Sequence, residues 1–124
     1  MSDKKTTIDE LKKLVRGFVD ERDWAQYHNP KDLALAMSIE VGELLEHFRY
    51  KDPEKIAEKL RTDQEYKREV GYELADVFYH VLVIADHLGI DLSTTFKEKL
   101  AVTAKKYPVH LVKGRNEKHT FYKK

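Results

Sequence analysis

The spacing of apolar and polar residues along the chain predicts four main helices joined by short connectors. Thr7 and Glu10 have the spacing of a capping box and begin a first helix that continues through LKKLVRGFVDERDW. Asn29 as the N-cap residue and Pro30 at the first helical position begin a second helix, which extends to about Tyr50. Because no segment shows a strong strand pattern of alternating residues, the sequence predicts an all-α fold.

The second half of the chain predicts one short helix and two long ones. The short helix covers residues 52–61 and carries few apolar residues, so it is expected to pack weakly. Thr62 and Glu65 repeat the capping-box spacing and begin the third main helix, which extends over residues 62–88. The fourth main helix covers residues 91–106.

Two residues mark the ends of these last helices. Gly89 is a natural C-terminal stop for the third helix, and Pro108 ends the fourth. Residues 108–124 are basic and lack periodicity, which predicts a C-terminal arm that becomes ordered on an oligomer or a ligand. We expect residues 1–124 to form a single domain.

Two carboxylates lie at the edge of the apolar stripe of the second main helix. At about 100° per residue, this stripe consists of Leu33, Met37, Val41, Leu44 and Phe48. Glu40 lies at its edge with Glu43 beside it, and Ile39 and Leu35 follow on the other side. The acidic pair is therefore bracketed by apolar residues and does not lie on an open polar face.

The third main helix is apolar in most directions, which predicts that it is buried. Its polar residues lie on one narrow stripe of the helix, formed by Glu73, Asp76, His80 and His87. We interpret His87 as a histidine near the negative end of the helix. His80 follows Asp76 by one turn, and its role as a charge partner of Asp76 or as a ligand is left open. The two central helices thus each carry two acids at i and i+3.

Converging carboxylates between helices predict a metal centre. Buried without partners, each would cost several kcal/mol or shift its pKa until it was neutral. A divalent cation removes this cost, and a set of oxygen ligands favours a hard ion such as Mg²⁺ or Mn²⁺. A single E-x-x-E or E-x-x-D motif usually lies on a solvated helix face. Two such pairs, each flanked by apolar residues, favour metal binding.

Composition narrows the functional classes further. The chain of 124 residues is 41% hydrophobic and 36% charged, with a net charge of +1. This balance gives no global field for a nucleic-acid polymer or an anionic membrane. The absence of cysteine excludes disulfides, zinc–thiolate sites and thiol chemistry. Without a signal-like N-terminus or an apolar run of membrane-spanning length, we expect a cytoplasmic protein.

The two acidic motifs, Glu40-Val-Gly-Glu43 and Glu73-Leu-Ala-Asp76, resemble the signature of the MazG-like all-α nucleoside triphosphate pyrophosphohydrolases. The segments ERDWAQYHNP, IEVGELLEHF, ELADV and KKYPVHLVKGR resemble the dCTP pyrophosphatase branch in the same order, over about residues 8–120. The resemblance implies a four-helix-type bundle, assembled as a dimer or tetramer, that binds Mg²⁺ (or Mn²⁺) through the four carboxylates.

The same resemblance implies an activity. The enzyme would cleave a (d)NTP between the α and β phosphates, giving the monophosphate and pyrophosphate in nucleotide-pool house-cleaning. A pyrimidine dNTP such as dCTP is the expected substrate. Glu43 is the expected residue for orienting or deprotonating the attacking water.

Matching positions supply the candidate substrate residues, namely Trp24, His28, Tyr50, His80, Lys99 and Lys106. Trp24 and Tyr50 match aromatic positions that sandwich a pyrimidine in this branch, and His28 would line the mouth of the pocket. Lys99 and Lys106 match basic positions that hold phosphates. His80 stands where the branch places a tyrosine, which leaves the base preference open.

Two other classes of protein compete with this interpretation. Ferritin-like metal bundles also use carboxylates, but their ligand helices carry Glu-x-x-His, which this chain lacks at the four acids. A helical interaction module, with structural acids and the basic arm holding a partner, is the other alternative. Neither alternative explains the order of the motifs along the chain.

Overall fold

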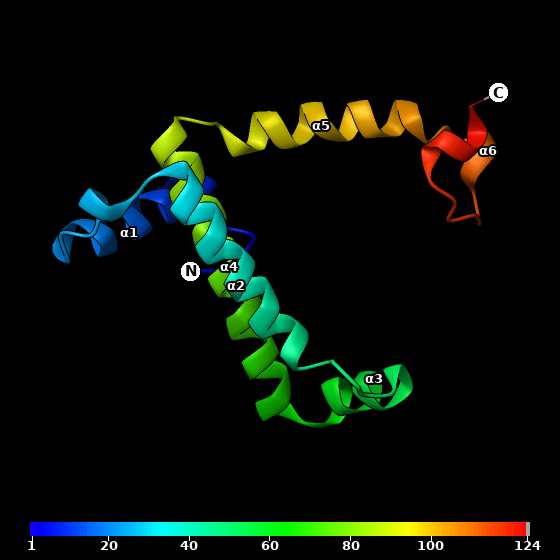
Figure 1. The fold of residues 1–124 in the computed structure, drawn as a ribbon, viewed down its shortest axis with the longest axis horizontal. Coiled ribbons are helices and arrows are strands. Elements are labelled where there is room, and N and C mark those ends of the chain that lie inside the picture. Colours follow the sequence, from blue (N-terminus) through cyan, green and yellow to red (C-terminus); the bar gives the residue numbers. More distant parts are fainter. Residues whose placement is uncertain (124) are drawn as a thin grey trace. The chain divides into compact units, whose positions relative to one another are not determined.

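The structure, a computed structural model, describes residues 1–123, and this part of the chain is helical without any strand (Figure 1). Its elements are α1 (Ile8–Glu21), η1 (Ala25–Tyr27), α2 (Pro30–Glu46), α3 (Pro53–Thr62), α4 (Gln64–Leu88), α5 (Leu92–Lys106), α6 (Val109–Val112) and η2 (His119–Tyr122). The chain divides into two compact units, and the second begins at Ile90. The all-α prediction is confirmed, whereas the four-helix bundle and the single domain stay predictions.

Local capping residues set most helix ends where the sequence placed them. Thr7 and Glu10 form the complete capping box of α1, with side chain to backbone distances of 3.1 Å and 2.7 Å. The Asn29 side chain accepts a hydrogen bond from the backbone N–H of Asp32 at 2.9 Å and caps α2. Gly89 ends α4 with a φ of 66°, a left-handed conformation that favours glycine.

Three predicted boundaries were wrong. Helix α1 ends at Glu21 and does not continue to Trp24, and Asp23 between them has a φ of 52°. Asp63, and not Thr62, caps α4, because its carboxylate accepts the N–H of Tyr66 at 3.1 Å while the Thr62 hydroxyl bonds back into α3. Helix α2 ends at Glu46 and does not reach Tyr50. Tyr50 has a φ of 61°, which no residue of a right-handed α-helix adopts.

The basic arm has more structure of its own than the sequence predicted. Within the second unit, α6 and η2 follow α5. The Tyr107 hydroxyl accepts the backbone N–H of His119 at 3.1 Å, and the two rings pack edge to face. The Tyr122 hydroxyl donates to Glu117 at 2.9 Å, and Arg115 pairs with the same carboxylate. These contacts link residues of the arm to one another and to Tyr107, and ordering on an oligomer or a ligand stays a prediction.

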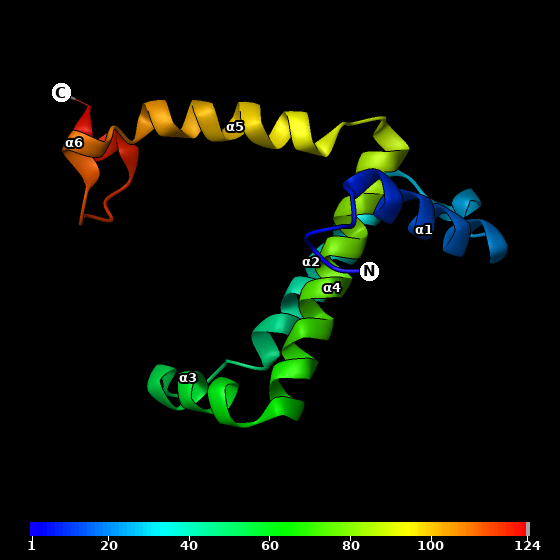
Figure 2. The same cartoon turned by 180° about the vertical axis from the view of Figure 1, so that it is seen from behind.

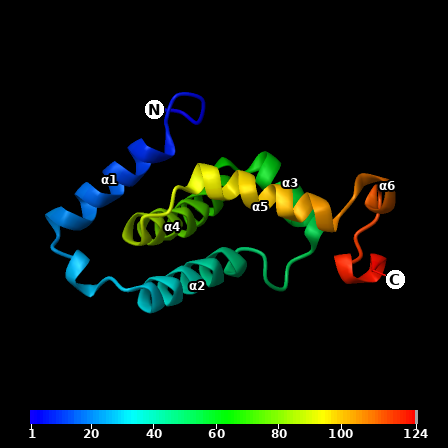
Figure 3. The same ribbon diagram turned by 90° about the horizontal axis from the view of Figure 1, so that it is seen from above.

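The first unit is built around α4. Helices α2 and α4 run antiparallel and side by side (Figures 1 and 2), and α4 lies between α2 and α1 (Figure 3). The core between them contains Val19, Leu33, Tyr66, Val70, Leu82, Val83 and Ala85. A bidentate pair between Arg16 and Asp86 ties α1 to α4 and lowers the pKa of the Asp86 carboxyl.

Large apolar side chains remain exposed on the two central helices. They are Leu35, Ile39, Val41 and Leu45 on α2, and Tyr72, Leu74, Phe78 and Leu88 on α4. Ile39 is 64% exposed and Leu74 is 55% exposed, so the single chain does not bury α4 all round as the sequence predicted. In residues 1–123, no helix combines the length and apolar character that crossing a bilayer requires.

Candidate metal centre and adjoining pocket

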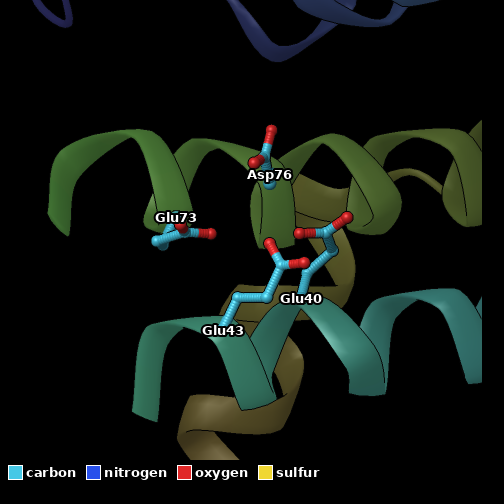
Figure 4. Close-up of side chains that lie close together, drawn as sticks. All are labelled: Glu40, Glu43, Glu73 and Asp76. Atoms are coloured by element: carbon cyan, nitrogen blue, oxygen red, sulfur yellow. The ribbon is translucent and has the colours of Figure 1, made fainter. Parts of the chain in front are cut away.

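Four carboxylates from α2 and α4 converge at one place in the first unit. One oxygen from each of Glu40, Glu43, Glu73 and Asp76 lies within 4.8 Å of the other three. Figure 4 shows Glu40 and Glu43 reaching from α2 toward α4, which carries the other two acids. The i, i+3 spacing places each pair on one helix face, and the antiparallel packing of the helices brings the two faces together.

The charges of this cluster are poorly compensated by the protein itself. Glu40 Oε2 and Glu73 Oε2 are buried and have no hydrogen-bond partner in the described residues. Burial raises the pKa of Glu40 above its ordinary value, and the neighbouring Glu43 and Asp76 carboxylates raise it further. Buried acceptor oxygens without donors are rare in folded proteins and indicate a missing positive partner.

The donor set fits a hard divalent cation. All four groups are carboxylates, without nitrogen or sulfur, which suits Mg²⁺ or Mn²⁺ better than softer metals. Glu43 and Asp76 are exposed, so an ion held here would keep access to solvent and to a ligand. The arrangement can therefore hold a metal ion with open coordination positions.

A pocket of about 490 Å³ adjoins the cluster and shares Glu40 and Asp76 with it. Its aromatic walls come from Phe18, Trp24, Tyr27 and Tyr79, and its polar lining from His28, Asp32 and His80. Phe18 packs edge to face against Trp24 and Tyr79, with ring centroids 5.6 Å and 6.0 Å away. A flat, partly apolar ligand with an anionic end would suit this combination of aromatic walls and a metal-binding end.

The structure brings some of the predicted substrate residues together. Trp24, His28 and His80 line the pocket beside the carboxylates. Tyr50 does not line it: this side chain is 96% exposed and borders a different depression, together with Lys55 and Lys59. Lys99 and Lys106 lie on α5 in the second unit, where Lys106 lines a pocket of about 410 Å³.

The environments of the two pocket histidines differ. The His80 Nδ1 donates to the backbone carbonyl of Asp76 at 2.9 Å, so Nδ1 carries a proton and the Asp76 carboxylate is left to the cluster. His80 therefore pairs with the backbone of Asp76 and still lines the pocket. Burial lowers the pKa of His28, and the nearby His87 and His80 lower it further, which favours a neutral ring at pH 7.

The sequence interpretation missed several residues of the site, namely Phe18, Tyr27, Asp32, His47 and Tyr79. Phe18 has the spacing of the core stripe of α1, yet it lines the pocket. Tyr79 follows Asp76 by three residues, a spacing that places both on one face and could have indicated it. His47 follows Glu43 by one turn and lies 3.6 Å from Glu73 through its Nε2, a contact between helices that no local pattern reveals.

Comparison with known proteins gives consistent results. The model of the MazG-like family matches residues 35–120, which contain all four carboxylates. Bovine dCTP pyrophosphatase 1 is 33% identical over 114 residues, which cover 92% of this chain and 67% of the bovine protein. The human dCTP pyrophosphatase 1 is 32% identical, with 66% of its length covered. The chain thus spans about two thirds of these relatives.

A solved structure supports the same relationship. The crystal structure of a pyrophosphatase from Archaeoglobus fulgidus aligns with a TM-score of 0.75 and 36% sequence identity. The alignment covers 87% of this chain and 98% of the archaeal one.

Proposed function

The chain belongs to the MazG-like family, and on this premise we propose that it is a nucleoside triphosphate pyrophosphohydrolase that releases a monophosphate and pyrophosphate. The observation that carries the proposal is the four-carboxylate cluster, with its two buried unpartnered oxygens, at the end of an aromatic-walled pocket. The pyrophosphatase names of the bovine, human and archaeal relatives support the reaction class.

The cation is held by the four carboxylates Glu40, Glu43, Glu73 and Asp76, and it is Mg²⁺ or, in its place, Mn²⁺. When bound, the cation supplies charge neutralisation for the phosphates and Lewis-acid activation of the reacting oxygens. The protein contributes a fixed set of anionic ligands on two packed helices, so little reorganisation is needed when the substrate arrives.

We assign the proton transfer to Glu43. Its side chain is exposed, whereas Glu40 and Glu73 are partly buried. As the water oxygen bonds to phosphorus, the phosphoanhydride bond between the α and β phosphates breaks and the water proton passes to the Glu43 carboxylate. Pyrophosphate and the nucleoside monophosphate leave as products.

We propose a pyrimidine dNTP such as dCTP as the substrate. The names of the mammalian relatives support this choice. A volume of about 490 Å³ lies within the range of small-ligand pockets, and its aromatic walls offer flat surfaces to a base. Trp24, His28 and His80 would face the nucleoside, while roles for Tyr50, Lys99 and Lys106 stay predictions.

The proposal is tested by a panel of dNTPs and NTPs, including modified cytosines, assayed with Mg²⁺ and then with Mn²⁺. The assay measures released pyrophosphate separately from orthophosphate. Pyrophosphate and monophosphate in equal amounts from a pyrimidine dNTP would support the reaction and the substrate together. No hydrolysis of any nucleotide with either metal would refute the enzyme and favour a non-enzymatic metal-binding or interaction bundle.

Trp24 is the residue to replace in order to test the base pocket. Trp24→Ala should raise KM for the preferred nucleotide by about tenfold and leave kcat nearly unchanged, because stacking of one base contributes about 1–3 kcal/mol. Trp24→Phe keeps a ring and should recover most of the affinity. Steady-state kinetics measure both constants, and an unchanged KM across all nucleotides would remove Trp24 from the pocket.

We also propose that the chain assembles with copies of itself, as a dimer or a tetramer. The exposed apolar side chains of α2 and α4, such as Ile39 and Leu74, would be covered in such an assembly. Light scattering should therefore give a mass at least twice the 14.6 kDa of one chain. Ile39→Glu should shift this mass toward the monomer, and a monomeric wild-type protein would contradict the proposal.

A further inference from the structure

We propose that His47 is a positioning residue of the metal centre, which holds the Glu73 carboxylate so that one of its oxygens stays available to a divalent cation. This inference rests on the proposed function, because it assigns His47 a role toward an ion held by the four carboxylates. His47 lies outside the two acidic motifs, so this role adds a new residue to the metal centre.

The contact between the two side chains divides the oxygens of Glu73. His47 Nε2 lies 3.6 Å from Glu73 Oε1, and the side chains are 19% and 20% exposed. The other oxygen, Oε2, is buried and has no hydrogen-bond partner in the described residues. Within residues 1–123, no other basic side-chain nitrogen is found within 4.0 Å of any of the four carboxylates. One oxygen thus faces the imidazole, and the second is left for a ligand.

His47 is itself fixed by a buried tyrosine of α4. Its backbone carbonyl accepts a hydrogen bond from the Tyr66 hydroxyl at 2.7 Å, and its ring packs against the Tyr66 ring with centroids 5.9 Å apart. Tyr66 is only 5% exposed and belongs to the core. A residue held at both its backbone and its ring has few ways to turn its imidazole away.

The register of α4 explains why one residue can reach both partners. Tyr66 and Glu73 are seven residues apart, which is about two turns of an α-helix, so they lie on the same face. His47 follows the last residue of α2 and lies beside this face. The core therefore sets the position of His47, and His47 in turn sets the position of Glu73.

Loss of the imidazole would release Glu73. Three other carboxylates lie close to Glu73 and repel it, and solvent offers its oxygens alternative partners. Residues that orient a metal ligand commonly change metal affinity by about 10- to 100-fold when they are replaced. A contact of 3.6 Å with a partly exposed histidine places the expected effect near the lower end of this range.

The test measures Mn²⁺ binding to the metal-free protein without nucleotide, from the electron paramagnetic resonance signal of the free ion. His47→Leu should raise the Mn²⁺ Kd by about tenfold. His47→Gln should recover most of the affinity, because its amide keeps N–H groups that can face the Glu73 carboxylate. His110→Leu, in α6, is the matched control and should bind as the wild type does. Circular dichroism in chelator reports whether each variant keeps its helices and its Tm.

Two results would overturn the role of His47. One is a His47→Leu protein that folds and binds Mn²⁺ with the wild-type Kd. The other is an equal loss of affinity in His47→Leu and His47→Gln, accompanied by an equal fall of Tm in chelator, which would indicate packing alone. If His47→Leu does not fold, His47→Asn replaces it in the test. The Asn side chain is too short to face Glu73, so this variant should bind Mn²⁺ about tenfold more weakly than the wild type. Wild-type Mn²⁺ affinity in His47→Asn would refute the role of His47.

The same experiment separates this inference from the proposed function. Wild-type protein that binds Mn²⁺, with binding lost in Asp76→Asn, supports the metal centre whatever His47 does. Wild-type protein that binds no Mn²⁺ would overturn the metal centre, and the role of His47 with it.

Discussion

Replacing Asp76 by Asn, or Glu43 by Gln, should lower kcat/KM at least about 100-fold, the scale expected when a group that stabilises transition-state charge is lost. Each change removes one negative charge from the cluster and keeps nearly the same side-chain shape. Both residues are exposed on their helices, so the helical content should stay close to that of the wild type. Pyrophosphate release under saturating Mg²⁺ and circular dichroism give the two measurements.

Glu46→Gln is the matched control for this prediction. Glu46 lies on α2, three residues after Glu43, and its carboxylate pairs with Arg49 at 3.0 Å on the exposed surface. The same chemical change at this position should leave kcat/KM within a factor of about two, since exposed ion pairs contribute little. Full activity of Asp76→Asn or Glu43→Gln, or an equal loss in Glu46→Gln, would mean that the active site lies elsewhere.

Glu40→Gln should make the metal-free protein more stable than the wild type at neutral pH, and less stable than the wild type in Mg²⁺. The pKa of Glu40 is raised in the folded state above its ordinary value of 4.5. Between these two pKa values the folded protein binds more protons than the unfolded chain, so the free energy of unfolding falls as the pH rises through this window. Above this pH window, the folded wild-type protein is destabilised by the ionised Glu40 carboxylate. The neutral glutamine side chain removes this destabilisation.

Added metal should reverse this order. At an Mg²⁺ concentration of about 100 times its Kd, binding to the folded state alone stabilises a protein by about 2.7 kcal/mol. Glu40→Gln lacks one ligand charge and should gain much less. Thermal unfolding of both proteins in chelator and in Mg²⁺ checks the prediction. A wild-type Tm that does not respond to Mg²⁺ would argue against the metal centre. A Glu40→Gln protein that is less stable than the wild type in chelator would argue against repulsion between the four carboxylates.

Helix ends were predictable from the sequence where a short motif acts alone. Two side chains cap a helix N-terminus and one glycine ends a helix, all through groups within four residues: Thr7, Asn29 and Gly89. The neighbouring residues in the chain therefore suffice to predict these three helix ends. Thr62 and Asp63 are adjacent residues that can both cap a helix, and only the folded geometry selects Asp63. The end of α2 was missed because the apolar period continues to Phe48, two residues beyond the last helical residue, Glu46.

The carboxylate cluster was predictable because helical periodicity fixes which side chains share a face. Glu40 and Glu43 on one helix, and Glu73 and Asp76 on the next, needed only the packing of the two helices to meet. His47 could not be predicted in the same way. Its relation to Glu73 depends on a contact across two helices and on the anchoring of its backbone by Tyr66.

The residues that line the pocket could be predicted from the sequence only in part. Trp24, His28 and His80 were assigned from matching segments of a family, and the structure places them together. Phe18 follows the apolar period of α1 and looks like a core residue, although it is 40% exposed and lines the pocket. Periodicity identifies the side of a helix that faces the protein, but it does not distinguish packed atoms from a cavity.

The proposed assembly through the exposed apolar faces of α2 and α4 would make the amount of protein in the sample a determinant of its folding. If chains associate through Ile39 and Leu74, folding and association are one equilibrium, and its midpoint depends on the total concentration of chains. Dilution then acts in the same direction as a denaturant, although it changes no bond within the chain. The melting temperature of such an assembly has a defined meaning only together with the concentration at which it was measured.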